Sequence, residues 1–165
     1  MLEAIKEFDT PTIFNAVSRV MRDLTPQKWY SNHTIRHLIP TLGSFCGYAV
    51  TAEVSTNDDE DHIGFGEYWK VLKAAEGPIV TLLKDIDSDP GRGASTGDGM
   101  SRNHKFYGVV GCIVDGTVRD VPGIEKVGLP VMGWGTVPGA QIQTTDPHAQ
   151  RLTGSAGAGQ ATVRS

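Results

Sequence analysis

The chain has 165 residues, of which 39% are apolar and 21% are charged, so it can bury the core of one ordinary domain and is not expected to be disordered. Its 15 basic and 19 acidic side chains give a formal charge of −4, which argues against nucleic acid as the main ligand. The N-terminal residues lack a signal-peptide pattern and no apolar run reaches transmembrane length, so we expect a cytoplasmic protein with no membrane partner. Cys46 and Cys112 lie in apolar runs, and we expect both to be buried, reduced thiols.

The first half of the chain predicts two helices on either side of one strand. Thr10 and Pro11 are suited to the N-cap and the first position of a helix, and apolar residues then recur at helical spacing up to Met21. We expect this helix to pack one face on the core. Residues 24–41 predict irregular structure, residues 45–54 a strand, and residues 65–72 an amphipathic helix.

The middle of the chain alternates short apolar runs with helical patterns, which predicts an α/β core. One helix is expected to follow Thr96, as its cap, with Asp98 in its first turn. His104 and Lys105, near the end of that helix, are expected to be solvated. In order, we expect a strand at 79–83, a helix at 97–106, a strand at 109–114, a helix at 121–127 and a strand at 129–134.

Three ligand-binding patterns are present in outline but do not have the residues or spacing that they need. Residues 85–91 resemble a calcium loop, but Pro90 and Thr96 stand where such a loop requires glycine and glutamate, so we predict a polar loop. The glycines between residues 91 and 99 do not have the spacing of a dinucleotide-binding loop. His33 and His37 are four residues apart, but no third metal ligand accompanies them.

The composition changes after residue 138. Gly, Ala, Ser, Thr and Gln dominate residues 139–165, where large apolar residues are few. Such a segment is not expected to supply buried strands, so we expect a loose tail or one draped over the surface. The predicted organisation is therefore one domain over residues 1–138 followed by an atypical tail over residues 139–165.

The residues best suited to chemistry follow the apolar strand at 109–114. Arg119 can bind a carboxylate through two parallel hydrogen bonds, and the adjacent Asp120 can offer an oxygen to a hard cation such as Mg²⁺. Asp98, if it folds against them, could hold or deprotonate a metal-bound water. A 2-oxo acid bound there would have its enolate stabilised, as cleavage of a carbon–carbon bond requires. The plain alternative is a surface ion pair and a first-turn aspartate that is favourable to the helix dipole.

Four segments resemble the RraA-like family: Gly97-Asp98-Gly99-Met100, Gly108–Gly111, Val114–Asp120 and Gly128–Val131. The aldolase signature of that family places twenty intervening residues between an acidic residue and an Arg-Asp pair, and Asp98 has this spacing from Arg119 and Asp120. Residues 8–13 and 47–51 also fit, so the resemblance covers about residues 8–138.

The resemblance implies a swivelling β/β/α domain of the α/β class, assembled as a homotrimer or hexamer. It implies a class II, divalent-metal-dependent lyase that cleaves 4-hydroxy-4-methyl-2-oxoglutarate or decarboxylates oxaloacetate. The cofactor would be Mg²⁺ or Mn²⁺, and the partner a small 2-oxo acid. By position, Asp120 would be the metal ligand, Arg119 would bind the oxo acid, and Asp98 would organise the water on the metal. The backbone at Gly97, Gly99 and Met100 would bind the substrate carboxylate.

The same family also contains regulators of ribonuclease E activity and members named demethylmenaquinone methyltransferases. The alternative function that the resemblance implies is therefore a non-catalytic regulator, which binds ribonuclease E or another protein through its surface. The family usually continues after the Leu129-Pro130-Val131 segment with further strands and a Gly-Asp turn. Residues 139–165 have neither pattern, and this altered C-terminus could impair aldolase activity.

Overall fold

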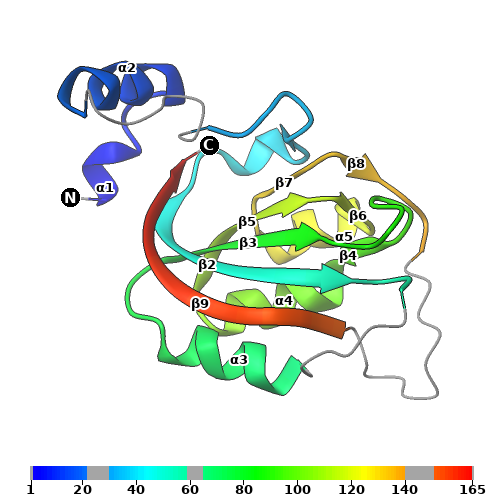
Figure 1. The fold of residues 1–165 in the computed structure, drawn as a ribbon. Helices are drawn as coiled ribbons and strands as arrows, with labels where there is room; N and C mark the ends of the chain where they lie inside the picture. The colour runs from blue at the N-terminus through cyan, green and yellow to red at the C-terminus, as the bar shows by residue number, and fades with distance from the viewer. Residues whose placement is uncertain (1, 22–29, 59–64, 140–150, 165) are drawn as a thin grey trace.

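The computed structural model describes residues 2–21, 30–58, 65–139 and 151–164, the last of these as backbone alone. Six strands form the main sheet, in the order β1-β7-β5-β3-β2-β9 (Figure 1). They are β1 (Arg36–His37), β2 (Cys46–Ser55), β3 (Ile79–Asp85), β5 (Val109–Asp115), β7 (Val131–Gly133) and β9 (Arg151–Arg164). The central strands β7, β5, β3 and β2 are parallel, whereas β1 and β9 pair antiparallel at the two edges. The predicted α/β core is confirmed.

The central strands are apolar on both faces, as is typical of parallel strands that are covered on both sides. In β3, every side chain except those of Leu82 and Lys84 is buried. In β5, the buried residues include Cys112 and Val114, neither of which is exposed to solvent. The core of the domain therefore lies along the centre of this sheet.

A second, three-stranded parallel sheet lies beyond the carboxyl ends of the central strands (Figure 1). It contains β4 (Ala94–Thr96), β6 (Thr117–Val118) and β8 (Gly135–Thr136). These strands directly succeed β3, β5 and β7, and β6 lies between the other two. Because β4 and β6 run side by side in the same direction, the residues that follow them emerge at the same end of the small sheet.

Three helices pack with the main sheet: α3 (Phe65–Ala74), α4 (Asp98–Phe106) and α5 (Val121–Val127). In Figure 1, α4 and α5 lie behind the strands, where they contact each other. Each helix buries apolar side chains in the core, among them Tyr68, Leu72, Met100 and Ile124. The helices predicted at 65–72, 97–106 and 121–127 are thus present.

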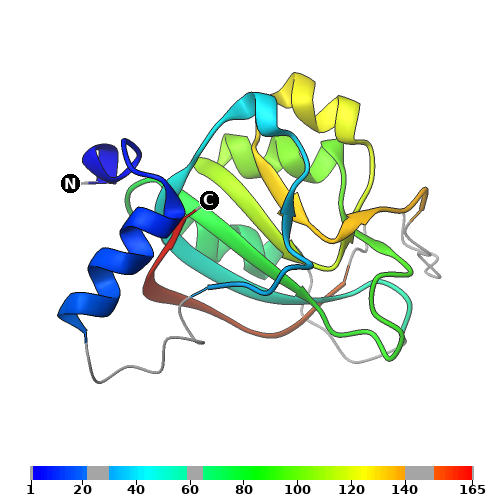
Figure 2. The same cartoon turned by 90° about the horizontal axis from the view of Figure 1, so that it is seen from above.

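The N-terminal helices differ from the prediction in what they contact. α1 (Leu2–Ile5) and α2 (Thr10–Val20) bury none of their residues, and Figures 1 and 2 show them to one side of the sheet. The N-cap of α2 is Asp9, whose Oδ1 accepts a hydrogen bond from Thr12 N at 2.9 Å. The expectation that α2 packs on the core is wrong, because apolar periodicity predicts a buried face without saying which surface covers it.

Two further details differ at the ends of elements. Thr96, the expected cap of α4, is a buried residue of β4, and Gly97 is the N-cap without a side-chain hydrogen bond. The part of residues 24–41 that lies within the described chain is not wholly irregular, since it contains β1 and a 3₁₀ helix at Pro40–Leu42. Short elements of this kind carry too few residues for a periodic signal.

His104 is fully buried, whereas the sequence led us to expect a solvated side chain. Its Nε2 lies 2.8 Å from the Tyr68 hydroxyl, within hydrogen-bond distance, and the ring meets Trp69 edge-on. Burial lowers the pKa of His104 to about 3, so the imidazole is neutral at physiological pH. His104 therefore joins α4 to α3 inside the core.

For residues 139–165 the sequence predicts a tail that is loose or draped over the surface, and the described part of this segment is not loose. Residues 151–164 form β9, which pairs antiparallel with β2 along most of its length and has two register shifts. Residues 140–150 and 165 lie outside the described residues. The pairing is possible for this Gly- and Ala-rich segment because a strand ladder is made by backbone groups.

Cys46 and Cys112 are both buried and free, as predicted. Burial raises the pKa of Cys112 to about 11, so this thiol stays protonated. In the part of the chain that the structure describes, none of the helices combines the length and hydropathy needed to cross a membrane.

Candidate functional site

The predicted site residues are delivered by the two neighbouring strands β4 and β6. Gly97 and Asp98 directly follow β4, and Arg119 and Asp120 directly follow β6. The register joins Thr96 to Val118, and the backbone N–H of Arg119 donates to Thr96 O at 2.9 Å. Two segments that are twenty residues apart in the chain therefore end side by side.

Gly97 allows the Arg-Asp pair to lie directly on the backbone. A Cβ built on Gly97 would stand 3.0 Å from Asp120 Oδ2 and 3.1 Å from Arg119 Cγ. Both distances are shorter than ordinary contacts between side chains, so a larger residue would displace the pair. A side chain at this position would therefore shift Arg119 and Asp120 by a few tenths of an ångström.

Asp120 has an unusual backbone conformation. Its φ of 56° is the one positive value among the described residues other than glycine, and aspartate is one of the few residues that tolerate this region. Asp120 is the N-cap of α5, but its carboxylate makes no capping hydrogen bond. Instead its Oδ2 lies 3.5 Å from Arg119 Nε, and 44% of the side chain is exposed. The carboxylate is therefore available to a ligand.

Within the described residues the Nε of Arg119 makes no hydrogen bond, and the Asp120 Oδ2 with which it forms an ion pair lies 3.5 Å away. This nitrogen is buried, although the side chain as a whole is 39% exposed. A buried N–H without an acceptor is costly and uncommon in native structures. An oxygen of a bound ligand would satisfy it.

Asp98 is the first residue of α4, and its carboxylate faces a different neighbour. Its Oδ2 accepts a hydrogen bond from Arg102 Nη2 at 2.5 Å, and a Cβ built on Gly123 of α5 would lie 2.8 Å from Asp98 Cβ. No hydrogen bond or ion pair joins Asp98 to Arg119 or Asp120 within the described residues. The structure thus brings the backbones of the two segments together and leaves their carboxylates unconnected.

The first turn of α4, which follows β4, offers backbone N–H donors. Ser101 N donates to Gly97 O at 3.0 Å, so the N–H groups before it, which include those of Gly99 and Met100, have no acceptor within the helix. Met100 is buried, whereas a Cβ on Gly99 would meet nothing within 4 Å. Such a helix start favours an anionic group.

The donor set at this end of the small sheet fits a hard divalent cation. Mg²⁺ usually takes one or two carboxylates and completes its shell with water and substrate oxygens. Asp120 and Asp98 are two such carboxylates, and within the described residues the Asp120 carboxylate accepts no hydrogen bond. In the same part of the chain no cluster of three or more His, Cys, Asp or Glu side chains is suited to a metal, as far as the described residues go. A cation bound here would therefore need ligands from water or substrate as well as from the protein.

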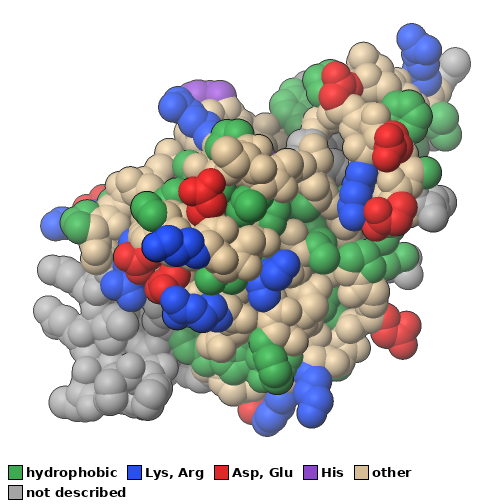
Figure 3. Space-filling view, turned by 180° about the vertical axis from the view of Figure 1, so that it is seen from behind, with side chains coloured by type: hydrophobic (Ala, Val, Ile, Leu, Met, Phe, Trp, Pro, Cys, Tyr) green, Lys and Arg blue, Asp and Glu red, His purple; other side chains and the backbone are tan. Residues whose placement is uncertain are grey.

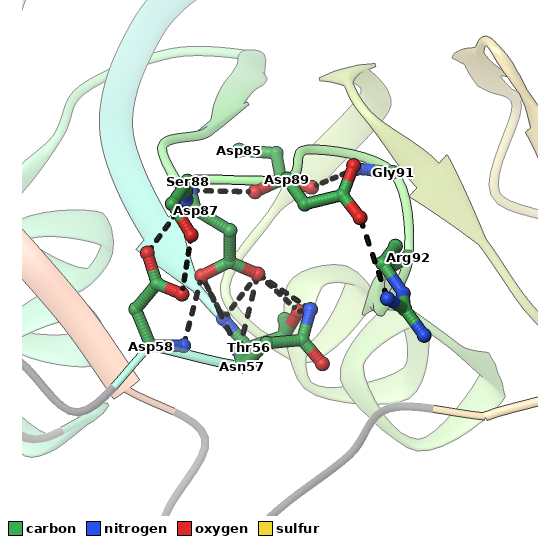
Figure 4. A network of polar contacts seen from close by, with 9 residues as sticks. All are labelled: Thr56, Asn57, Asp58, Asp85, Asp87, Ser88, Asp89, Gly91 and Arg92. Carbon is green, nitrogen blue, oxygen red and sulfur yellow. Dashed lines mark hydrogen bonds and ion pairs between the residues drawn. The ribbon is translucent and has the colours of Figure 1, made fainter.

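The polar loop predicted at residues 85–91 is present, and at the carboxyl ends of β2 and β3 it forms a hydrogen-bonded group with residues 55–58 that we did not predict (Figure 4). The Asp87 carboxylate accepts hydrogen bonds from the hydroxyls of Ser55 and Thr56 and from the backbone and side chain of Asn57. The Asp85 carboxylate accepts from the backbone N–H groups of Asp87 and of Gly91. These contacts are internal, so the group fixes the conformation of the loop at 85–91. The alternating aspartates after an apolar strand were the available signal.

The pKa values of the two aspartates in this group are shifted in opposite directions. Burial alone would raise the pKa of Asp87, but the hydrogen bonds from Ser55, Thr56 and Asn57 outweigh it and hold the pKa below its ordinary value. Burial raises the pKa of Asp85, because its two backbone hydrogen bonds compensate only in part. The group therefore stabilises the loop mainly through the ionised Asp87.

On the side of the molecule shown in Figure 3, acidic and basic side chains lie next to one another. This mixing agrees with the ion pairs that the structure contains, such as Arg102 with Asp98 and Arg119 with Asp120.

Comparison with solved structures identifies proteins of similar fold. A novel cellulase from microbes associated with the gut ecosystem has a TM-score of 0.69 at 18% identity, over 98% of this chain and 68% of that one. Streptomyces coelicolor RraAS2, described as an unusual member of the RNase ES inhibitor RraA protein family, has a TM-score of 0.65 at 21% identity, over 94% and 70% of the two chains. The RNA-processing inhibitor RraA from Thermus thermophilis has a TM-score of 0.53 at 19% identity, over 79% and 73%.

At these identities the solved structures show likeness of fold alone. A search of curated proteins finds no match to the chain. The family model described as RraA-like, Aldolase/RraA, matches residues 10–162. Because this match spans nearly the whole sequence, the chain belongs to the RraA-like (Aldolase/RraA) family and has its mixed α/β fold.

Proposed function

We propose that this protein is a divalent-metal-dependent lyase that acts on pyruvate-type 2-oxo acids. The reaction would be aldol cleavage of 4-hydroxy-4-methyl-2-oxoglutarate, decarboxylation of oxaloacetate, or both. One observation carries the proposal: Arg119 and Asp120 lie against Gly97, with Arg119 Nε buried and making no hydrogen bond within the described residues. Membership of the Aldolase/RraA family supports this class of chemistry.

Arg119 and the start of α4 bind the substrate in this proposal. The N–H groups near Gly99 and Met100 receive the carboxylate next to the oxo group, where the helix dipole also favours negative charge. Arg119 donates to the oxygens of the oxo acid through its guanidinium. The substrate is then fixed by donors from two different segments.

Asp120 holds Mg²⁺ or Mn²⁺ in this proposal, and the chemistry that such an ion supplies when bound is Lewis-acid stabilisation of enolate charge. Asp98 orients a water molecule through which a proton moves. In aldol cleavage the substrate hydroxyl loses its proton and becomes the carbonyl of the second product, while the electron pair of the broken carbon–carbon bond forms the pyruvate enolate. In decarboxylation CO₂ leaves, and in both reactions a proton then converts the enolate to pyruvate.

A coupled assay of pyruvate release tests this function. Asp120→Asn removes the charge, while asparagine tolerates the positive φ at this position. We expect a loss of about 100-fold in kcat/KM, since the ion would lose its protein ligand, and a similar loss for the wild type with a chelator. Asp89→Asn, which removes one partner of an exposed ion pair with Arg92, is the matched control. Pyruvate release that is unaffected by chelator and by Asp120→Asn would exclude the mechanism.

A non-catalytic regulator that binds ribonuclease E or another protein is the second candidate, and the exposed apolar face of α2 is the observation that favours it. Such a regulator would release no pyruvate. It would also retain its partner in a pull-down after Arg119→Ala, because its binding surface is not the candidate site.

We also propose that the chain assembles as a homotrimer or hexamer. The support is the same face of α2, which forms an apolar groove of about 390 Å³. The groove is lined by Phe8, Thr12, Ile13, Ala16, Val17, Val20 and Met21. A second copy of this chain that covers it would remove this apolar surface from water.

A further inference from the structure

Arg102 brings a second guanidinium to the candidate site. It lies one helical turn after Asp98 on α4, and its Nη2 donates to Asp98 Oδ2 at 2.5 Å. This is its one hydrogen bond within the described residues. A guanidinium has five N–H donors, and 64% of this side chain is exposed. Most of its donors are therefore free to bind a ligand.

The balance of charge at the site favours a substrate with two negative charges. Asp98 and Asp120 carry two negative charges, which Arg102 and Arg119 cancel. With the divalent cation of the proposed function added, two positive charges remain. A dicarboxylate neutralises both of them, whereas a monocarboxylate leaves one, and an uncompensated charge is costly where water is partly excluded.

The space next to Arg102 is open to such a ligand. Gly99 and Arg102 are three residues apart on α4, so they share one side of the helix. A Cβ on Gly99 would have no heavy atom within 4 Å. A ligand whose first carboxylate lies at the start of α4 can therefore extend along this side toward the guanidinium.

We propose that Arg102 is a specificity-determining residue that binds the second carboxylate of a dicarboxylic 2-oxo acid. The inference rests on the proposed function, whose two named substrates are both dicarboxylic, and assigns a residue to their second carboxylate. When Arg102 moves to the substrate it leaves Asp98, and this frees the carboxylate to which the proposed function assigns proton transfer. With a monocarboxylic acid, Arg102 stays on Asp98.

Calorimetric titration in the presence of Mg²⁺ tests this inference without requiring turnover. 2-Oxoglutarate and 2-oxopentanoate have the same chain length and differ in whether the far end is a carboxylate or a methyl group. We expect the wild type to bind 2-oxoglutarate about tenfold more tightly or better, because a charge-assisted hydrogen bond is added. Arg102→Gln should abolish the preference, chiefly by weakening the binding of 2-oxoglutarate, and Arg102→Lys should restore part of it.

The control is Arg92→Gln, which removes another exposed arginine of an ion pair, away from the site. An unchanged preference in Arg102→Gln, an equal loss for both ligands, or no preference in the wild type would overturn the role of Arg102 and leave the lyase proposal standing. If the wild type binds neither ligand with Mg²⁺, the proposed function itself fails, and the inference fails with it.

Discussion

Gly123 shows how closely single residues determine the geometry of the candidate site. A Cβ built on it would lie 2.8 Å from Asp98 Cβ, which is closer than real side chains approach. We therefore expect Gly123→Ala to lower the free energy of unfolding by about 1–2 kcal/mol, since overpacking outweighs the better helix propensity of alanine. It should also lower pyruvate release, because Asp98 is displaced. Urea unfolding and the pyruvate assay measure the two effects.

Gly66→Ala is the matched control for this substitution. Gly66 lies in α3, and a Cβ there would meet nothing within 4 Å. The same gain in helix propensity should leave stability unchanged or slightly raised. Equal stability of the two variants would show that α4 and α5 separate at little cost.

Sequence spacing identified the segments that the fold brings together, but not how their side chains pair. Asp98 and Arg119 emerge side by side because β4 and β6 are neighbours. The pairing of Asp98 with Arg102 was available as an i, i+4 pattern, which we overlooked. The positive φ of Asp120 could not be predicted, since it arises from the path that the chain takes between β6 and α5.

At the scale of elements, the contact between α3 and α4 predicts a pH dependence. The pKa of His104 is about 3 in the folded protein and 6.5 for an ordinary histidine. Between these two pH values His104 is protonated in the unfolded chain but not in the folded protein. The free energy of unfolding therefore falls as the pH is lowered from about 6.5 toward 3. The slope attributable to this residue is at most about 1.4 kcal/mol per pH unit.

His104→Gln should flatten this part of the profile of unfolding free energy against pH, because glutamine keeps a polar group near Tyr68 but does not titrate in this range. His33→Gln, which removes an exposed histidine, should leave the slope unchanged. If His104→Gln retains the slope of the wild type between pH 6.5 and 4, burial of a neutral imidazole is not its source.

Apolar periodicity predicted the long elements and failed for the short or atypical ones. α3 and β5 carry clear apolar patterns and appear where expected. β4 consists of three buried residues, Ala94 to Thr96, of which two are polar, so no pattern marked it as a strand. For His104, the pattern of one helix could not show that Tyr68 of another helix would offer a hydroxyl.

At the scale of the whole molecule, α2 predicts self-association. Val20 is 83% exposed and Phe8 57%, and an isolated helix of eleven residues is marginal in water. Light scattering after size exclusion should give three or six times the chain mass of 17.7 kDa. Ile13→Lys with Val17→Lys should reduce the particle to a monomer, because charges would replace apolar contacts.

Asn15→Lys adds one positive charge at an exposed position outside the groove and should preserve the assembly. A wild type that elutes as a monomer would mean that α2 serves another partner. The sequence indicated the apolar face of α2, but the surface that covers it is not a property of one chain. Similarly, the composition of residues 151–164 did not indicate a strand, because β9 depends on backbone pairing with the edge of β2.

The hydrogen bond between Thr96 O and Arg119 N explains why the number of residues between Asp98 and Arg119 is constrained. Between Thr96 and Arg119 the chain leaves β4, passes through α4 and β5, and returns in β6, which lies beside β4. A residue inserted at the turn before β5, where Gly108 has a φ of +84°, can be absorbed there. A residue deleted within β5 would reverse the alternation of its side chains and turn Arg119 to the opposite face. Length variation among homologues should accordingly be rare within β5 and occur at the Gly108 turn or outside this interval.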